Sequence, residues 1–382
     1  MTDVYPNVED LLLATDPQLA VYCVYPHVYW KSTRHFLDGF PGRVLYAVKA
    51  NNHPDVVKQI YDAGVRHFDC ASLAEIDLVA ESCPDSTIYY MNPVRFEGNA
   101  KTAQQKHGVR HFVVDHHSGL APLISEIDAD NSVVFARMAV SHESALEDLS
   151  AKFGAKPENI PALLTAIVDA GAEPALAFNV GTGVMDPEAY EYSIGIARTA
   201  LSGLPFKVRL LDIGGGFPRR YPGFEVPELD EYFARTQRAA EDLPLADDGE
   251  LLSEPGRALS APGLSAVTRV LLRKTDRLYL NDGMYGAFWE LRFRGHLQYP
   301  CRAFRNGRPL GGETQAFRLF GPTCDSQDEL PARVDLPADI DVGDHIEFGS
   351  IGAYSLSGRT DFNGFYSDHV VSIVDPDALP PS

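Results

Sequence analysis

The sequence has 382 residues, of which 45% are hydrophobic and 23% charged, and no apolar run reaches the roughly 18 residues of a membrane-spanning helix. Its formal charge of -20 disfavours nucleic acid and anionic membranes as partners, because both attract cationic surfaces. The five cysteines lack CxxC spacing, which argues against a disulfide framework and a zinc site. With no export signal recognisable at the N-terminus, these features predict a cytoplasmic protein.

Apolar runs alternate with segments of helical period from Val44 to Ser253, a pattern typical of repeated β-α units. Eight such runs favour a closed (β/α)₈ barrel of the TIM type, with a doubly wound open sheet as the alternative. The predicted strands are 44–48, 65–69, 87–91, 109–114, 133–139, 175–178, 208–213 and 250–253. The predicted helices are 54–63, 73–81, 120–127, 160–170, 187–201 and 229–240, with a weaker pattern at 99–107.

The rhythm changes after Pro262 to strand-like runs separated by Gly, Pro and Asp turns, which predicts a mainly antiparallel β domain. An apolar run at 21–25 lies outside the β-α repeat, and we expect it to pair in that domain. The predicted division is an N-terminal segment at 1–29 that joins the β domain, a barrel at 30–262 and the β domain proper at 263–382. Its predicted strands are 266–272, 278–280, 316–319, 345–348 and 369–373.

Polar residues follow the predicted barrel strands at the ends that form one rim, where the chemistry of such barrels lies. Taken singly they are typical of a surface lysine, a tight turn or a surface ion pair. Together they fit pyridoxal phosphate, since a lysine can form an imine, glycine N–H groups and an arginine can hold phosphate, and a carboxylate can keep the pyridine nitrogen protonated. These residues are Lys49, Asp69, Arg137, Asn179, Gly214, Gly215, Gly216, Glu254 and Arg257.

In order and spacing, eight segments resemble the fold-type III pyridoxal phosphate decarboxylases, the family of ornithine and diaminopimelate decarboxylases with an alanine racemase-like barrel. The resemblance runs from about Tyr22 to Val374, and Cys324-Asp325 is more similar to the ornithine-type members. The segments are 46–51 (Tyr-Ala-Val-Lys-Ala-Asn), 68–72, 152–154, 212–218 (Asp-Ile-Gly-Gly-Gly-Phe-Pro), 254–257 (Glu-Pro-Gly-Arg), 281–283, 321–325 (Gly-Pro-Thr-Cys-Asp) and 362–365.

The resemblance implies a role for each site residue. Lys49 would be the Schiff-base lysine and Glu254 the partner of the pyridine nitrogen, with Asp69 and Arg137 supporting them from the rim. The phosphate would be bound by Gly214, Gly215, Gly216, Arg257 and Tyr354.

The family also implies that two residues reach the site from a neighbouring subunit. Cys324 would return a proton after CO₂ leaves, and Asp325 would contact the far end of the substrate. A homodimer with shared sites follows from this arrangement. Without the resemblance, Cys324 would read as a buried structural thiol.

Two departures from the family pattern bear on the substrate. Asn179 stands where ornithine-type enzymes have a histidine that stacks on the cofactor, and Arg294 stands where eukaryotic members have an acidic residue for the distal amine. An arginine there would repel an ammonium group; alternatively, Arg292 and Arg294 lie on a solvated strand face.

We therefore predict a decarboxylase of a basic or polar L-amino acid, with ornithine or lysine, converted to its diamine, as the leading substrate. The first alternative is a less usual amino acid selected by Asn179 and Arg294. The second is a non-catalytic regulatory homologue.

Overall fold

The computed structural model describes residues 3–295 and 297–382, and these described residues divide into two compact units. The barrel unit comprises Thr33–Arg219 and Val226–Ala258. The β unit comprises the other described residues, including the short segment Arg220–Glu225. The first two residues of the predicted N-terminal segment lie outside the described part of the chain.

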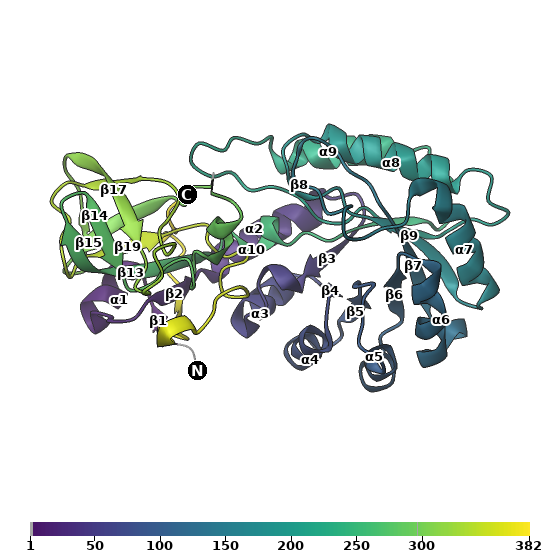
Figure 1. The fold of residues 1–382 in the computed structure, drawn as a ribbon, viewed down its shortest axis with the longest axis horizontal. Coiled ribbons are helices and arrows are strands. Elements are labelled where there is room, and N and C mark those ends of the chain that lie inside the picture. The colour runs from purple at the N-terminus through teal and green to yellow at the C-terminus, as the bar shows by residue number, and fades with distance from the viewer. Residues whose placement is uncertain (1–2, 296) are drawn as a thin grey trace. The chain divides into compact units, whose positions relative to one another are not determined.

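Among the described residues, eight parallel strands close a barrel in the order β11-β12-β3-β4-β5-β6-β7-β9, which confirms the predicted (β/α)₈ fold (Figure 1). The closure excludes the doubly wound open sheet, because β12 pairs with β3 to join the first and last strands. The barrel strands are β3 (Arg43–Ala47), β4 (His67–Cys70), β5 (Thr87–Tyr90), β6 (His111–Val114), β7 (Val133–Met138), β9 (Glu173–Phe178), β11 (Leu210–Asp212) and β12 (Glu250–Ser253).

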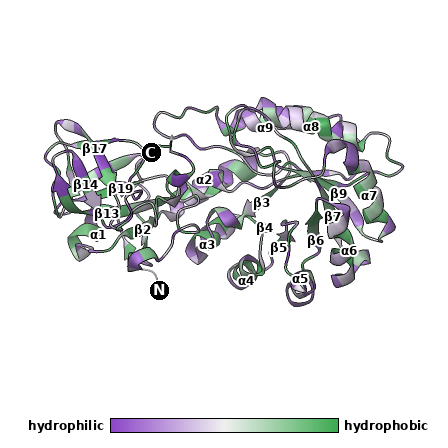
Figure 2. Ribbon diagram, in the orientation of Figure 1, coloured by the Kyte–Doolittle hydropathy of each residue, from purple (hydrophilic) through white to green (hydrophobic). Residues whose placement is uncertain are grey.

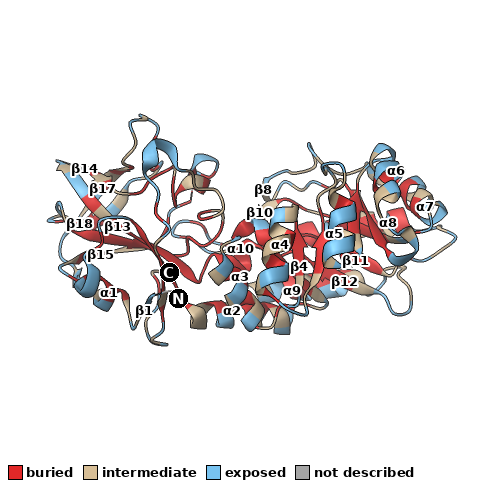
Figure 3. Ribbon diagram, turned by 90° about the horizontal axis from the view of Figure 1, so that it is seen from below, coloured by how far each residue is buried: buried red, intermediate tan, exposed pale blue. Residues whose placement is uncertain are grey.

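Apolar side chains from alternate strand positions form a buried core in the barrel unit. Among them, Tyr89, Phe135 and Leu252 are fully buried. Burial of each such side chain contributes about 1.5–3 kcal/mol, so the short strands are stabilised mainly by tertiary packing. Figure 3 shows the strands buried and the outward sides of the surrounding helices exposed.

The helices of the β-α repeat mix hydrophobic and hydrophilic residues, which appear as mixed colours along the ribbons in Figure 2. Helix α4 begins at a capping box, in which the Ser72 hydroxyl accepts from the Glu75 N–H and the Glu75 carboxylate accepts from the Ala71 N–H. The helices are α2 (Pro26–Gly39), α3 (Pro54–Asp62), α4 (Leu73–Ser82), α5 (Asn99–His107), α6 (His117–Glu126), α7 (Ile160–Asp169), α8 (Glu188–Leu201), α9 (Leu229–Ala240) and α10 (Arg257–Ser260).

The structure of helix α5 explains why the helical pattern in its sequence is weak. Its buried residues are Ala100 and Ala103, so its apolar stripe is narrow. The Glu126 carboxylate accepts hydrogen bonds from Gly98 N and Ala100 N at 2.7 and 3.0 Å, and it thereby caps the helix from α6. Among the described residues, no helix is both long and apolar enough to cross a membrane.

The β unit contains a mixed, mainly antiparallel sheet with the path β1-β20-β2-β13-β14-β17-β18, and β19 also joins β13 to β15. Strand β2 contains most of the early apolar run, and it pairs with β13 and β20 as predicted. The strands of this unit are β1 (Asp3–Tyr5), β2 (Val21–Val24), β13 (Leu264–Lys274), β14 (Arg277–Leu280), β15 (Cys301–Arg305), β16 (Arg308–Leu310), β17 (Thr314–Phe320), β18 (Val334–Pro337), β19 (His345–Phe348) and β20 (Val370–Ile373).

Short elements complete the two units. Helix α1 (Val8–Thr15) belongs to the β unit, where its buried residues Val8, Leu11 and Leu12 pack into a core that includes β2 and β20 residues. In the barrel unit, β8 (Ala145–Glu147) pairs antiparallel with β10 (Thr182–Val184) outside the barrel sheet. The strands β1, β15, β16 and β18 were not predicted, because they are short and rich in polar residues or proline.

Candidate functional site

Lys49 lies in a 3₁₀ turn, Val48–Ala50, immediately after β3. Register places Asp69 of β4 opposite Ala47, so its side chain starts close to the turn that carries the lysine. Lys49 Nζ donates to Asp69 Oδ2 at 2.9 Å, and the Lys49 side chain is 45% exposed while that of Asp69 is 1% exposed. The lysine therefore has its ammonium oriented by a buried carboxylate while remaining accessible.

Two buried carboxyl groups lie at the C-terminal ends of the neighbouring strands β11 and β12, where Asp212 ends β11 and Glu254 directly follows β12. Burial and the charge of Asp212, the last residue of β11, raise the pKa of Glu254 well above its usual range. Burial raises the pKa of Asp212 itself to about 6, although the Gly214 N–H donates to its Oδ1 at 2.8 Å. The charges of Lys49 and Arg137 act in the opposite direction and lower the pKa of Glu254.

The segment that carries Glu254 packs directly against the lysine turn. The Ala47 N–H donates to Pro255 O at 3.2 Å, and a Cβ on Gly256 would lie 2.7 Å from the Ala50 Cβ. A side chain at position 256 would force the two segments apart. Glycine at this position thus keeps Glu254 and Lys49 on neighbouring parts of one rim.

Gly214, Gly215 and Gly216 form a tight loop after β11. Gly214 and Gly216 have φ values of +73° and +94°, and a Cβ at Gly214, Gly215 or Gly216 would come within 2.6 Å of a backbone oxygen. Among the described residues, we find no acceptor for the N–H groups of Gly215 and Gly216. Such a loop can cradle a phosphate with its amides.

Two buried carboxylate oxygens of the barrel unit have unused hydrogen-bonding capacity. Asp69 Oδ1 and Asp212 Oδ2 are buried oxygens that find no partner among the described residues. Arg257, at the start of α10, is 7% exposed. A lysine, a buried carboxyl pair, an amide cradle and an arginine in the barrel unit therefore fit the donor and acceptor groups of pyridoxal phosphate.

Asn179 follows β9 and helps to shape the same rim. Its Oδ1 accepts from the Gly181 N–H at 3.1 Å, so the amide closes a local turn. A Cβ on Gly214 would lie 2.9 Å from the Asn179 Cα, which puts the asparagine backbone against the glycine loop. The amide side chain can offer hydrogen bonds to a ligand, but it cannot act as an imidazole would.

Tyr354, Cys324 and Asp325 belong to the β unit. Tyr354 adopts a φ of +55°, a left-handed conformation that is unusual for a tyrosine. Cys324 is exposed, and its Sγ lies 3.3 Å from Asn363 Oδ1, so the expectation of a buried structural thiol is wrong. Asp325 accepts from the Tyr285 hydroxyl, and this hydrogen bond lowers the pKa of the carboxyl group.

The Tyr285 cluster, consisting of Tyr285, Arg292, Asp325 and Phe362, was not recognised as a unit from sequence. The Phe362 ring stacks on Tyr285 with centroids 4.5 Å apart, and the Arg292 guanidinium lies 4.1 Å from the Tyr285 centroid. Arg294 points elsewhere: it is 7% exposed and pairs with Glu290 at 3.0 Å. The two arginines lie around a 3₁₀ turn, Trp289–Arg292, and not on a strand.

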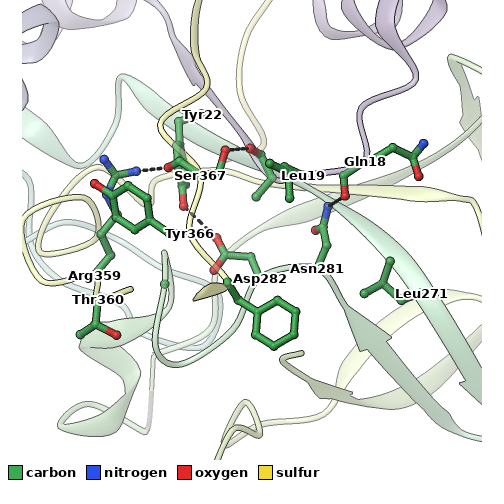
Figure 4. A pocket seen from close by; sticks show the side chains of 13 residues that line it. Gln18, Leu19, Tyr22, Leu271, Asn281, Asp282, Arg359, Thr360, Tyr366 and Ser367 are labelled. Atoms are coloured by element: carbon green, nitrogen blue, oxygen red, sulfur yellow. Dashed lines mark hydrogen bonds between the residues drawn. The ribbon is translucent and has the colours of Figure 1, made fainter. Parts of the chain in front are cut away.

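Asp282 organises the loop that presents Tyr285. Its carboxylate accepts from the N–H groups of Gly283 and Ala287 and from the Tyr22 hydroxyl at 3.0 Å. Figure 4 shows the Tyr22 and Asp282 side chains pointing toward each other beside a pocket of about 120 Å³. Because a Cβ on Gly286 would lie 1.7 Å from Asp282 Oδ1, the loop wraps closely around this carboxylate.

Asp328 connects that loop to the Cys324 segment. Its Oδ1 accepts from the Met284 N–H at 2.7 Å, and its Oδ2 accepts from the N–H and hydroxyl of Thr323 at 3.0 and 2.7 Å. The side chain is buried, and a Cβ on either Gly283 or Gly321 would lie 2.3 Å from its oxygens. Asp328 therefore holds Tyr285 and Cys324 in a common frame.

Replacing Asp328 with asparagine is expected to destabilise the protein by about 1–3 kcal/mol, because the amide NH₂ would face backbone N–H groups where the carboxylate accepts. Urea denaturation would measure the loss. Asp335→Asn, on the exposed side of β18, is the matched control and is expected to leave stability within about 0.5 kcal/mol. Equal stabilities for the two variants would contradict the bridging role.

Comparison with known proteins gives a consistent picture. Residues 28–261 match the family described as "Pyridoxal-dependent decarboxylase, pyridoxal binding domain". The lysine/ornithine decarboxylase of Selenomonas ruminantium is 32% identical over 337 residues, covering 85% of this chain and 81% of that protein. Antizyme inhibitor 2 of Xenopus laevis is 31% identical over 366 residues, covering 88% and 76%.

The solved structures agree with the sequence relatives. The arginine decarboxylase of Paramecium bursaria Chlorella virus, bound to agmatine, superposes with a TM-score of 0.85 and 28% identity, covering 96% of this chain and 99% of that one. The lysine/ornithine decarboxylase of Vibrio vulnificus, complexed with cadaverine, has a TM-score of 0.83 at 28% identity, covering 96% and 97%.

Proposed function

The chain belongs to the pyridoxal-dependent decarboxylase family, and on that premise we propose that it decarboxylates a basic or polar L-amino acid, with ornithine and lysine as the first candidates. It is a pyridoxal phosphate-dependent enzyme of this family. The observation that carries the proposal is the Lys49–Asp69 pair, accessible on the rim beside the buried Glu254 and Asp212.

The residues of the barrel unit would divide the work of holding the cofactor. The N–H groups of Gly215 and Gly216 and the Arg257 guanidinium would bind its phosphate, and Glu254 would hold a proton at its pyridine nitrogen. When bound, the cofactor supplies an electron sink for the bond that breaks as CO₂ leaves. Asp69 would orient Lys49 Nζ and stabilise its positive charge, since the two lie 2.9 Å apart.

Residues of the β unit would complete the site from a partner subunit in a cytoplasmic homodimer. Cys324, exposed in the single chain, would donate the proton that replaces the carboxylate. Asp325 would meet the distal end of the substrate, and its carboxylate supports the choice of ornithine or lysine. The arginine, lysine and ornithine decarboxylases among the similar proteins also act on amino acids with cationic side chains.

A panel of L-amino acids tests this proposal through CO₂ release. Purified protein loaded with pyridoxal phosphate is expected to decarboxylate at least one member with a basic or polar side chain, and the set should include ornithine, lysine, arginine, glutamine and glutamate. Release from the ornithine or lysine sample would support the leading assignment. A protein that binds the cofactor yet leaves the whole panel unchanged would contradict the proposed substrate class.

A further inference from the structure

The Tyr285 cluster contains a charged residue, Arg292, to which the proposed function gives no role. The Tyr285 ring stacks with the Phe362 ring, with centroids 4.5 Å apart, and the Arg292 guanidinium lies 4.1 Å from the Tyr285 centroid. Its hydroxyl donates to Asp325, so the ring connects the guanidinium to the carboxylate. A backbone bond from Thr360 N to Tyr285 O at 2.8 Å fixes the tyrosine further.

Hydrogen bonds to buried carboxylates hold the Tyr285 cluster in place. Asp282 holds the backbone on both sides of Tyr285, through Gly283 N and Ala287 N, and Asp328 also accepts from Met284 N. The same Asp328 carboxylate binds Thr323, two residues before Asp325. The segments that carry Tyr285 and Asp325 are thus both held by hydrogen bonds to buried carboxylates.

The positive charge of Arg292 changes the electrostatic environment of the Asp325 carboxylate. Arg292 is close enough to contribute to the lowered pKa of Asp325, after the larger effects of the Tyr285 hydroxyl and the Gln327 N–H. Asp325 therefore stays ionised, but one of its oxygens is occupied by Tyr285 and a guanidinium lies nearby. An ammonium group that approaches Asp325 meets the repulsion of Arg292.

The other charged residues of this region are already paired or bonded. Arg294 is 7% exposed and pairs with the buried Glu290, so a carboxylate of the same unit balances its charge. The Asp328 carboxylate is surrounded by N–H and O–H donors. Arg292, by contrast, is exposed over the tyrosine ring.

We infer that Arg292 is a specificity-determining residue of the substrate site. It makes the Tyr285 cluster favour a substrate whose side chain ends in a hydrogen-bond acceptor over one whose side chain ends in an ammonium group. A carboxylate or carboxamide would accept from the guanidinium. The inference rests on the proposed function, since Asp325 meets the substrate only in that arrangement. It narrows the proposed class of basic or polar L-amino acids toward the polar members, because Arg292 offsets the attraction that Asp325 would exert on the ammonium group of ornithine or lysine.

The test compares kcat/KM for ornithine with kcat/KM for glutamate and glutamine in the cofactor-loaded wild type and in Arg292→Leu. We divide kcat/KM for ornithine by kcat/KM for glutamate or glutamine, whichever is the better substrate. This ratio is expected to be at least about 10-fold higher in Arg292→Leu than in the wild type, because the variant no longer repels an ammonium group and no longer donates to an acceptor. Arg292→Lys, which keeps a charge without the planar fork, is expected to give an intermediate ratio.

A second tyrosine of the β unit that contacts both a cation and a phenylalanine ring supplies the matched control. Lys274 Nζ lies 4.8 Å from the Tyr279 centroid, and the Phe320 ring stacks with Tyr279 with centroids 5.0 Å apart. Lys274→Leu also removes an exposed cation from a tyrosine face, and it is expected to leave the ratio within about twofold of wild type.

The possible results separate the inference from the proposed function. If the wild type releases CO₂ from these substrates and Arg292→Leu leaves the ratio within twofold, the inference is wrong and the proposed function stands. An equal loss of all activities, with a lower melting temperature, would assign Arg292 a structural role only. A wild type inert toward every amino acid would overturn both.

Discussion

Lys49→Ala is expected to lower kcat by at least about 10³-fold, equivalent to about 4 kcal/mol of transition-state stabilisation. The lysine is the accessible nucleophilic amine of the rim, held by Asp69 at 2.9 Å. Its loss would remove the amine proposed to bond the cofactor, and it would leave the buried Asp69 carboxylate without this cation. CO₂ release and the visible absorption of the loaded protein would both be measured, and the absorption of the variant is expected to match that of free cofactor.

The same variant changes stability in a predictable direction. Asp69 would keep a buried charge without Lys49, so the cofactor-free variant is expected to lose about 1–3 kcal/mol at pH 7. Lys58→Ala is a matched control, because Lys58 also pairs with an aspartate, Asp62, but is exposed on α3. Wild-type activity or absorption in Lys49→Ala would contradict the assignment of this lysine.

Glu254→Gln is expected to lower kcat by about 10²-fold or more, since a neutral amide cannot hold the positive charge of a protonated pyridine nitrogen as a carboxylate does. The buried position of Glu254 and its proximity to Lys49 and Arg137 carry this expectation. Steady-state rates at saturating cofactor would measure it. Glu313→Gln, an exposed residue of the β unit, is the control and should retain wild-type activity.

The Glu254 variant also tests the buried carboxyl pair in the absence of cofactor. Because burial raises the pKa of Asp212 from 3.8 to about 6, the folded protein holds protons that the unfolded chain has released. Stability from this group is therefore lost as the pH rises through that interval. Glu254→Gln removes one of the two carboxyl groups, so the variant is expected to be more stable than wild type by about 1–3 kcal/mol at pH 8. Urea denaturation across pH 4–8 would reveal this, and parallel curves would contradict the coupling.

Local patterns predicted the barrel well because each strand of the β-α repeat is an apolar run that is recognisable without its neighbours. The predicted strand 44–48 overlaps β3 (Arg43–Ala47), and the predicted strand 250–253 coincides with β12 (Glu250–Ser253). Strands of the β unit such as β15 (Cys301–Arg305) were missed because arginines interrupt the apolar residues. Those arginines pair with carboxylates that are far away in the sequence, as Arg302 does with Glu347 at 2.6 Å.

The candidate site shows the same division. Lys49, Asp69 and Glu254 were predicted as rim residues, because the C-terminal end of a barrel strand can be located from sequence. Asp212 was not, since it is the last residue of a buried strand and its raised pKa depends on Glu254, which lies far along the chain. The prediction for Arg294 rested on register with a family pattern, whereas the structure pairs Arg294 with Glu290 and puts Arg292 over Tyr285.

By itself the sequence determined the repeat of apolar runs, the order of the strands and the polar residues at their ends, because these depend on residues close together in the chain. Tertiary structure alone decided which carboxylates share a buried site, and which arginine lies beside Asp325. The physical reason is that pKa shifts, ion pairs and ring contacts depend on distances of a few ångströms between residues separated by tens of positions. Such distances follow from packing of the whole unit and not from any local pattern.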